Sequence, residues 1–439
     1  MMNFRQSYGN YKDSGIDWIK EIPLKWSIER VRNVTCNTAM NLSVDEIKKR
    51  EWFYYDIPTV QQLNDGKITN GKNIESNKFI IKGGELLISK LNPRKATVVL
   101  TEHKELPIIC STEFVALMTR EINAQFLYYV LSTNVIADLL NSYVKSVTNS
   151  HQRVNPNDIK NLFIPVASTK EQEAIVEFLD NHIQEIDSLI EKKINMIGLI
   201  EEKRQAIITE AVTKGLNPNV KMKNSGVKWI GEIPEHWEIS KIKYQAYINK
   251  NILSEQTDEY QEINYIDISS VNSKGEISNV ESYIFKEAPS RARRIVFKGD
   301  TIVSTVRTYL KAIATIEKNE KNLICSTGFA VLTPKKNIDA KYLSFLFKTS
   351  IYIDEIVSRS TGVSYPAINA SEIGNLECIL PTLEEQQVIV NFIESSISEI
   401  DKLVKVNIKQ IEKLKEYRQS LVYEAVTGKI DIRDVEIDS

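Results

Sequence analysis

The chain has 439 residues, of which 42% are hydrophobic and 26% are charged. This length suggests two or three domains, and the composition excludes wholesale disorder and the fibrous classes of protein. The formal net charge is only −2, because 56 Lys and Arg residues face 58 Asp and Glu residues. This balance argues against a uniformly basic nucleic-acid binder.

The four cysteines are too few for a disulfide scaffold, and none of them has the CxxC spacing of a zinc ribbon. The first residues, MMNFRQSYGNYKDSG, lack the apolar stretch of a signal peptide. No run of the sequence approaches the roughly 18 to 20 apolar residues of a membrane span. We therefore expect a protein of the reducing cytoplasm that has no membrane partner.

The sequence contains a tandem duplication. DSGIDWIKEIPLKW (residues 13–26) recurs as NSGVKWIGEIPEHW (224–237), and EQEAIVEFLDNHIQEID (171–187) recurs as EQQVIVNFIESSISEID (385–401). Between these motifs, Cys110 of ICSTEF matches Cys325 of ICSTGF. The separation of matched residues is nearly constant along the whole chain, which indicates two copies of one unit with small insertions between them.

Each copy continues with a stretch of β-branched runs and then with apolar helical patches. The runs lie at residues 79–90 and 96–100 in the first copy and at 294–305 and 312–316 in the second. Their Gly-Glu and Gly-Asp punctuation predicts strands that are joined by tight turns. Helical patches follow at residues 124–140 and 340–357. The pattern favours a mixed α/β globule in each copy.

Apolar residues then recur with heptad spacing, which predicts one long helix in each copy. The positions that form this seam are Ile183, Ile186, Ile190, Ile197, Ile200 and Ile207 and, in the second copy, Ile397, Ile400, Val404, Ile411, Leu414 and Leu421. Lys193 and Asn407 interrupt the seam at matching places, as do Arg204 and Arg418, and polar seam residues commonly fix register or orientation. Heptads of this kind are usually plain core. A helix of about 42 residues spans about 60 Å, which also suits a spacer between two globules.

Sequence motifs of common enzymes are absent. The chain has no GxxxxGK[ST] phosphate loop, no GxGxxG, no GxSxG and no HExxH, and its four histidines have no ligand spacing. We therefore predict no catalytic, cofactor-binding or metal-binding residues in this chain.

Basic charge is concentrated at equivalent places in the two copies. Residues 78–104 contain six basic and two acidic residues, and residues 286–311 contain seven and two. The helical residues 384–426, by contrast, contain six basic and eight acidic residues. The near-neutral total thus hides two basic zones, and clustered Lys and Arg suit contact with phosphates.

Within these zones, and in a second pair of aligned segments at residues 148–155 and 362–369, we predict contacts with DNA. Arg can bond to guanine, and Asn or Gln can pair with adenine. Any one of these residues is more often a solvated surface group, but their recurrence in both copies supports the set. The predicted contacts are Lys90, Asn92, Arg94, Lys95, His151, Gln152, Arg153, Arg291, Arg293, Arg294, Arg307, Tyr309, Lys311, Ser364 and Tyr365.

The two copies of the Trp-Pro-Trp segment, the long helices that start with Glu-Gln, and the EAVTKGL and EAVTGKIDIRD sequences together resemble the specificity subunit of a type I restriction–modification enzyme. The resemblance covers essentially the whole chain. It implies an α+β protein with two α/β target recognition domains in tandem, separated by two long helices packed as an antiparallel coiled coil. The expected parts are a first recognition domain with its N-terminal segment (1–170), a central helix (171–215), a second recognition domain (216–383), and a C-terminal helix and tail (384–439).

The resemblance also implies the function. Each recognition domain would bind one half of a bipartite site in double-stranded DNA, and the helices would set the gap between the halves. Two modification subunits would methylate adenine with S-adenosylmethionine, and two restriction subunits would use ATP and Mg²⁺. This chain would be non-catalytic and would hold no cofactor of its own. The alternative from the residues alone is a coiled-coil scaffold whose globules bind other proteins.

Overall fold

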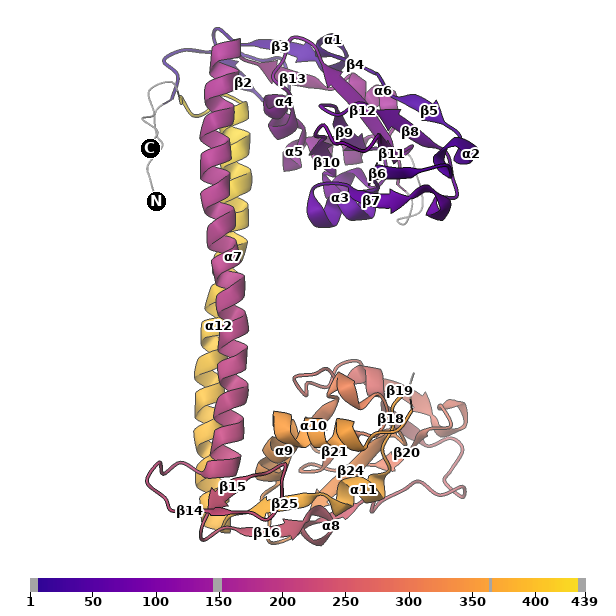
Figure 1. Cartoon of the computed structure of the whole chain (residues 1–439), viewed down its shortest axis with the longest axis vertical. Coiled ribbons are helices and arrows are strands. Elements are labelled where there is room, and N and C mark those ends of the chain that lie inside the picture. Colours follow the sequence, from indigo (N-terminus) through magenta and orange to yellow (C-terminus); the bar gives the residue numbers. More distant parts are fainter. Residues whose placement is uncertain (1–6, 145–151, 363–364, 433–439) are drawn as a thin grey trace. The chain divides into compact units, whose positions relative to one another are not determined.

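The computed structural model describes residues 7–144, 152–362 and 365–432. The chain divides into two compact units: Met1–Lys193 together with Lys409–Ser439, and Ile194–Ile408. Each unit contains one α/β globule and parts of both long helices, α7 (Thr169–Lys214) and α12 (Leu383–Val426) (Figure 1). The expected fold class, with two α/β domains in tandem and a packed pair of long helices, is confirmed.

The first globule consists of short strands with few helices. Its strands within the described residues are β1 (Tyr11–Asp13), β2 (Glu21–Pro23), β3 (Ser27–Arg30), β4 (Thr35–Cys36), β5 (Met40–Leu42), β6 (Glu51–Tyr55), β7 (Lys67–Asn70), β8 (Lys78–Ile81), β9 (Leu86–Ser89), β10 (Val98–Leu100), β11 (Ile108–Ser111), β12 (Phe114–Thr119) and β13 (Phe163–Val166). Its helices are α1 (Val31–Val34), α2 (Val44–Ile47), α3 (Ile57–Leu63), α4 (Ala124–Leu131), α5 (Asn134–Ser142) and α6 (Pro156–Lys160), with 3₁₀ turns η1 (Gly71–Asn73) and η2 (Pro93–Lys95).

Two sheets form the body of this globule. One has the strand order β10-β9-β12-β4 and is antiparallel; the other has the order β5-β8-β11-β6-β7 and contains one parallel pair, β11 with β6. The predicted strands of residues 79–90 are present as β8 and β9, but they belong to different sheets. The Gly83-Gly84 turn therefore joins two sheets and is not the turn of a hairpin. Both glycines have positive φ, at 92° and 77°, which is readily accessible to glycine.

The second globule repeats this plan. Its strands within the described residues are β14 (Met222–Asn224), β15 (Glu232–Pro234), β16 (Glu238–Lys241), β17 (Ala246–Ile248), β18 (Glu262–Ile266), β19 (Glu281–Ile284), β20 (Ala292–Ile295), β21 (Thr301–Ser304), β22 (Ile313–Thr315), β23 (Leu323–Ser326), β24 (Phe329–Pro334) and β25 (Glu377–Leu380). Its helices are α8 (Ile242–Gln245), α9 (Ala340–Lys348), α10 (Ser350–Arg359) and α11 (Ala370–Asn375), with 3₁₀ turns η3 (Ile268–Ser270), η4 (Phe285–Glu287) and η5 (Thr308–Leu310). The sheets β17-β24-β21-β22 and β19-β18-β23-β20 correspond to those of the first globule, and β18 and β23 are again parallel.

Each predicted helical patch is two helices and not one. The first patch is divided into α4 and α5 at Thr133, and the second into α9 and α10 at Thr349. The side chain of Thr349 accepts a hydrogen bond from the backbone N–H of Tyr352 while its hydroxyl donates to the Leu346 carbonyl. A threonine in this position caps the second helix, and its extended backbone ends the first.

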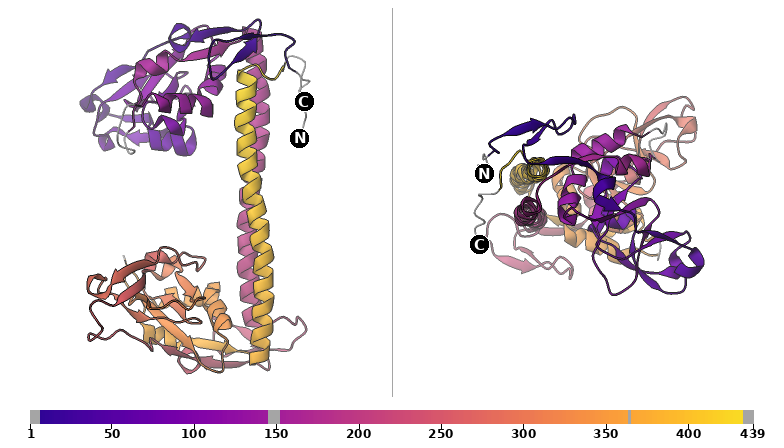
Figure 2. Two further views of the ribbon diagram at one scale, coloured as in Figure 1. Left: turned by 180° about the vertical axis from the view of Figure 1, so that it is seen from behind. Right: turned by 90° about the horizontal axis from the view of Figure 1, so that it is seen from above.

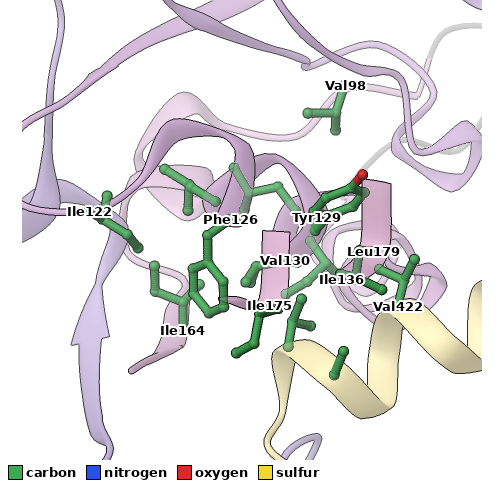
Figure 3. Packing of buried hydrophobic residues seen from close by; sticks show 14 of the residues in the cluster. Val98, Ile122, Phe126, Tyr129, Val130, Ile136, Ile164, Ile175, Leu179 and Val422 are labelled. Atoms are coloured by element: carbon green, nitrogen blue, oxygen red, sulfur yellow. The ribbon is translucent and has the colours of Figure 1, made fainter. Parts of the chain in front are cut away.

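The core of each unit joins the globule to both long helices. In the first unit, Phe126 and Val130 of α4 pack with Leu179 of α7 and with Val422 of α12 (Figure 3). Trp26 lies in the same core and is 1% exposed, as is Trp237 at the equivalent place in the second unit. Burial of such large apolar side chains stabilises each globule against its helices, at about 25 cal/mol per Å² of apolar surface.

The long helices run antiparallel. Asp187 and Lys193 of α7 bond to Arg418 and Gln410 of α12 in the first unit, and Arg204 of α7 bonds to Asp401 in the second. Residue numbers thus rise along one helix as they fall along the other, and the end-on view shows the helices side by side (Figure 2). All twelve seam positions are buried or half-buried, which confirms the heptad pattern. In the described part of the chain, no helix combines the length and apolarity needed to cross a membrane.

Candidate nucleic-acid interface

Two short turns, η2 and η5, occupy equivalent places in the two globules. η2 connects β9 to β10, and η5 connects β21 to β22. Both turns are flanked on each side by left-handed residues: Asn92 and Ala96 have φ of 50° and 44°, and Arg307 and Lys311 have φ of 51° and 56°. Left-handed backbone costs a non-glycine residue about 1 to 2 kcal/mol. Strain of this kind is often found at binding sites, where the surrounding structure holds it in place.

A second loop supports the turn in the first unit. The backbone N–H of Asn92 donates to the Gln152 carbonyl at 2.8 Å, and the N–H of Val154 donates to the Lys90 carbonyl at 3.0 Å. The two segments that we predicted separately to contact DNA therefore lie side by side. Helix α5 packs against η2 from within the globule.

The second unit has the same two-loop arrangement. The N–H of Arg307 donates to the Pro366 carbonyl at 2.8 Å, and the N–H of Ile368 donates to the Thr305 carbonyl at 2.9 Å. Helix α10 packs against η5, and the hydroxyls of Thr308 and Ser360 are 2.9 Å apart. The two units thus share the same backbone arrangement of a 3₁₀ turn bonded to a second loop.

The side chains on these backbones differ between the units. In the first unit, Arg94 and Lys95 are exposed, while Lys90 and Asn92 are half-buried. Arg153 forms a two-point contact with the Glu113 carboxylate, with Nε–Oε2 and Nη2–Oε1 distances of 3.1 and 3.0 Å. This geometry orients the guanidinium of Arg153 at the surface, where it is 54% exposed.

In the second unit the corresponding surface is more aromatic. The guanidinium of Arg307 lies over the ring of Tyr365, 4.7 Å from the ring centroid, and Tyr365 is 64% exposed. Tyr309 is 51% exposed, and Lys311 is exposed as well. Stacked Arg and Tyr groups present flat apolar faces next to positive charge, which suits both bases and phosphates.

Five predicted residues remain: three arginines, which have different placements, and two residues that the structure does not describe. The backbone carbonyl of Arg291 accepts a hydrogen bond from Thr327, next to the loop, whereas Arg293 lies over the ring of Phe285 at 4.8 Å. Nη1 of Arg294 donates to the side chain of Asn249 and to the Phe329 carbonyl, so it is engaged inside the globule. His151 and Ser364 lie outside the described residues.

Glu113, which orients Arg153, was not among the residues predicted from the sequence. A comparison of the two copies could have identified Glu113, because ICSTEF in the first copy becomes ICSTGF in the second, a change from Glu to Gly. Gly328 takes the place of Glu113, and Ala367 takes the place of Arg153. A Cβ atom on Gly328 would lie 2.4 Å from Cδ1 of Ile268. The carboxylate and its arginine are thus absent together from the second unit.

Two buried polar atoms at the first loop pair have no hydrogen-bond partner among the described residues. They are Oδ1 of Asn92 and Oε1 of Gln152. Buried acceptors of this kind are costly unless a further donor reaches them. Because both oxygens are buried, their unmet hydrogen bonds add to the cost of holding the first loop pair in this conformation.

Comparison with known proteins gives consistent matches along the chain. The family model described as type I restriction modification DNA specificity domain matches residues 31–198 and again 234–413. The type I restriction enzyme MjaVIII specificity subunit of Methanocaldococcus jannaschii is 22% identical over 402 residues, which is 87% of each chain. The EcoBI specificity subunit of Escherichia coli is 22% identical over 445 residues, covering 98% of this chain and 91% of that protein.

Solved structures show a similar fold. A chain from a study of complex assembly and conformational transition of the type I R-M system superposes with a TM-score of 0.69 at 18% identity, covering 92% of this chain and 98% of that one. The HsdS subunit from Thermoanaerobacter tengcongensis superposes with a TM-score of 0.50 at 19% identity, covering 93% and 98%.

Proposed function

Since this chain belongs to the family of type I restriction–modification DNA specificity domains, we propose that it is the DNA-binding specificity subunit of such a system. Each globule is a target recognition domain that binds one half of a bipartite site in double-stranded DNA. The long helices set the number of unspecified base pairs between the halves. The chain determines which DNA sequence is recognised and does not catalyse a reaction itself.

One observation carries this proposal: the loop pair around η2 and η5 has the same backbone in both units but different side chains. Because the backbone is shared, we expect both surfaces to contact DNA in the same manner. Different side chains, with Arg94 and Lys95 in one unit and Arg307 and Tyr309 in the other, would select different base sequences. Because one chain holds both surfaces, the second binding event is effectively intramolecular, and this raises the affinity for a site that has both halves.

The long helices offer repeated places for partner subunits. Leu189 and Ile194 of α7 are 46% and 54% exposed, and their equivalents Leu403 and Ile408 of α12 are 54% and 46% exposed. Apolar side chains that recur on two equivalent faces fit two copies of one partner. We assign these faces to two modification subunits that methylate adenine with S-adenosylmethionine. Two restriction subunits that use ATP and Mg²⁺ would complete the assembly in the cytoplasm.

The alternative, a scaffold whose globules bind proteins, differs from this proposal in one measurable property. Lys and Arg that neutralise phosphates release counterions, so binding to duplex DNA must weaken as salt rises, with a negative log–log slope. A scaffold would show no such binding. The exposed basic side chains on both loop pairs favour DNA.

The decisive experiment uses two matched variants, Arg94→Ala and Arg307→Ala, each co-expressed with the modification subunits. Sequencing of methyladenine across a genome then gives both half-sites. We expect Arg94→Ala to relax or weaken selection at one half-site and Arg307→Ala at the other, by about 1 to 3 kcal/mol at the contacted base. Arg120→Ala is the control, because Arg120 is exposed and follows the end of β12 that lies away from the loop pair. If both variants altered the same half-site, the assignment of one half-site to each globule would be wrong.

A further inference from the structure

The second unit contains a large cavity between its globule and the long helices. Its volume is about 1350 Å³, and all of its lining residues fall between Glu201 and Lys405, within that unit. Residues of β22 and α9 form one side, and residues of α7 and α12 form the other. A cavity of this volume exceeds the few hundred to about 1,000 Å³ typical of small-molecule sites.

Most of the acidic groups in this cavity already have partners. Glu201 pairs with Arg204 and Lys274 at 2.9 and 3.1 Å, and Asp401 pairs with the same Arg204. Glu394 pairs with Lys341. Asp339 accepts hydrogen bonds from two backbone N–H groups at the start of α9. The acids of the cavity are therefore largely neutralised or engaged by the protein itself.

The lysines are not neutralised in the same way. Five lysine ammonium groups that line the cavity make no hydrogen bond or ion pair with any described residue, and one acid, Glu317, is left to face them. These lysines are Lys298, Lys311, Lys348, Lys402 and Lys405. The cavity thus has a marked excess of uncompensated positive charge.

Lys348 at the end of α9 is the most enclosed of the five. It is half-buried, whereas the other four are exposed. Its Nζ would lie 3.1 Å from a Cβ atom built on Gly275, so the ammonium is held against the backbone of the globule. Burial lowers the pKa of Lys348, an effect that Glu317 opposes. An ammonium group that is withdrawn from water without an anionic partner is costly, and a bound anion would remove that cost.

The first unit shows that the fold does not require this set of lysines. In the repeat alignment, none of the five has a lysine at the equivalent place: Lys298 corresponds to Gly83, Lys311 to Ala96, Lys348 to Ser132, Lys402 to Ser188 and Lys405 to Glu191. Ser344, which lines the cavity of the second unit, corresponds to Tyr128. The cavity at the equivalent place, lined by Ala124, Gln125 and Tyr128, has a volume of about 340 Å³. Of the two units, the second thus has both the larger cavity and the lysine cluster.

We infer that this cavity of the second unit is a binding site for a phosphate-bearing polyanion. Several lysines around one cavity bind phosphate groups as point charges, without the planar geometry that arginine demands. The phosphates come either from a free oligophosphate, such as the triphosphate of a nucleotide, or from the backbone of bound DNA. This site goes beyond half-site recognition, because four of its five lysines are not among the predicted DNA contacts. The exception is Lys311, which follows η5 and lines both surfaces.

Two variants borrowed from the first unit test the site in the full-length chain. Lys348→Ser removes the enclosed charge, and Ser344→Tyr fills the cavity; both introduce the residue that the same fold already holds in the other copy. Lys203→Ala, an exposed helix lysine that does not line the cavity, is the control. Circular dichroism and thermal unfolding establish that the variants fold.

The first arm measures binding of sodium tripolyphosphate by calorimetry, and the second measures binding of duplex DNA by fluorescence anisotropy across salt concentrations. If the natural ligand is a free oligophosphate, wild-type protein binds tripolyphosphate. Each variant should then raise the dissociation constant for tripolyphosphate by about 10-fold or more, the range for loss of one charge-assisted hydrogen bond. The affinity for DNA should stay the same. If the phosphates belong to DNA, Lys348→Ser weakens DNA binding on all sequences and reduces the salt slope by about 1.

The inference is overturned if wild-type protein binds no tripolyphosphate at millimolar concentration and both variants bind DNA as wild type does. Its failure is distinct from failure of the proposed function, because half-site preference is measured separately from tripolyphosphate binding. If the chain bound tripolyphosphate but had no preferred DNA sequence, the polyanion site would be supported and the proposed role in DNA recognition would be wrong.

Discussion

Arg418 of α12 donates a hydrogen bond of 2.6 Å to Asp187 of α7, and the same bond is made again between the equivalent residues of the repeat. Asp401 is the counterpart of Asp187, and Arg204 is the counterpart of Arg418; these two residues form the second pair. In an antiparallel helix pair built from two related copies, a cross-helix contact can be made twice where both of its residues recur in the second copy, as they do here. The two arginines that interrupt the apolar seam therefore fix the register of both helices at two places.

Double-mutant cycles on these two pairs should give small but unequal coupling energies. Arg418 and Asp187 are 38% and 48% exposed, so their coupling should be about 0.2 to 1 kcal/mol. Arg204 is 15% exposed and also contacts Glu201 at 2.9 Å, so its replacement by Ala should cost more than that of Arg418. Urea unfolding of the full chain measures both. A larger loss for Arg418→Ala would contradict the structure.

Gly198→Ala should stabilise α7. Gly198 lies in the interior of the helix, is exposed, and a Cβ atom added to it would meet nothing within 4 Å. Glycine in an exposed helix interior is less favourable than Ala by about 0.8 to 1 kcal/mol, and the equivalent position in α12 is Glu412. Thermal unfolding should show an increase in stability of this order.

Gly71→Ala provides the opposite case for the same substitution. A Cβ atom on Gly71 would lie 1.9 Å from the backbone carbonyl oxygen of Ile47, which cannot move without displacing the chain around it. This variant should lose stability, whereas Gly198→Ala gains it. Equal effects at the two positions would show that local packing does not decide the outcome.

The Glu-Gln pair that starts each long helix illustrates what sequence could and could not reveal. Its recurrence marks the start of the helix, but its role lies in contacts between distant segments. Oε1 of Gln172 accepts from the N–H of Asn123 at 2.8 Å, and Gln386 accepts in the same way from Asp339. The buried glutamine thus ties the N-terminus of an earlier helix of the globule, α4 or α9, to the long helix, which no local pattern predicts.

At the candidate sites, too, local features could be predicted from the sequence, whereas contacts between distant segments could not. Heptad spacing and the repeat predicted the long helices, because each depends on the order of neighbouring residues. The pairing of η2 with the loop at Gln152 depends on contact between segments that are far apart in the sequence, and the inward donor of Arg294 depends on the carbonyl of Phe329. The cavity at Lys348 is formed by separate segments of the second unit and has no signature in any one of them.

Glu385→Gln should reduce stability at neutral pH and much less in acid. Burial tends to raise the pKa of Glu385, but hydrogen bonds from His236, from Nε1 of Trp237 and from the N–H of Thr382 together outweigh it, so the pKa is lowered. A lowered pKa in the folded state contributes stability above the unfolded value of about 4.3, and that stability is lost as pH falls through the folded value.

Unfolding of wild type and of Glu385→Gln between pH 7 and pH 3 measures this difference. The gap between the two proteins should close as pH falls below about 4. Glu384→Gln is the control, because Glu384 is exposed and its side chain makes no contact of this kind with the described residues. A gap that stayed constant with pH would show that the Glu385 carboxylate does not stabilise the start of α12 through its charge.

Insertion of one heptad into each long helix should lengthen the recognised gap between half-sites. The two Arg–Asp pairs determine where the insertions belong. If seven residues are inserted after Ile197 in α7 and after Ile408 in α12, both Arg–Asp pairs and the Lys193–Gln410 contact are preserved. Seven residues add about 10.5 Å at 1.5 Å per residue, which is about three base pairs at 3.4 Å each. Mapping of methyladenine in cells that hold the cognate modification subunits measures the gap. Insertion into α7 alone should instead misalign one Arg–Asp pair and destabilise the chain, and an unchanged gap after the double insertion would rule out the helices as its determinant.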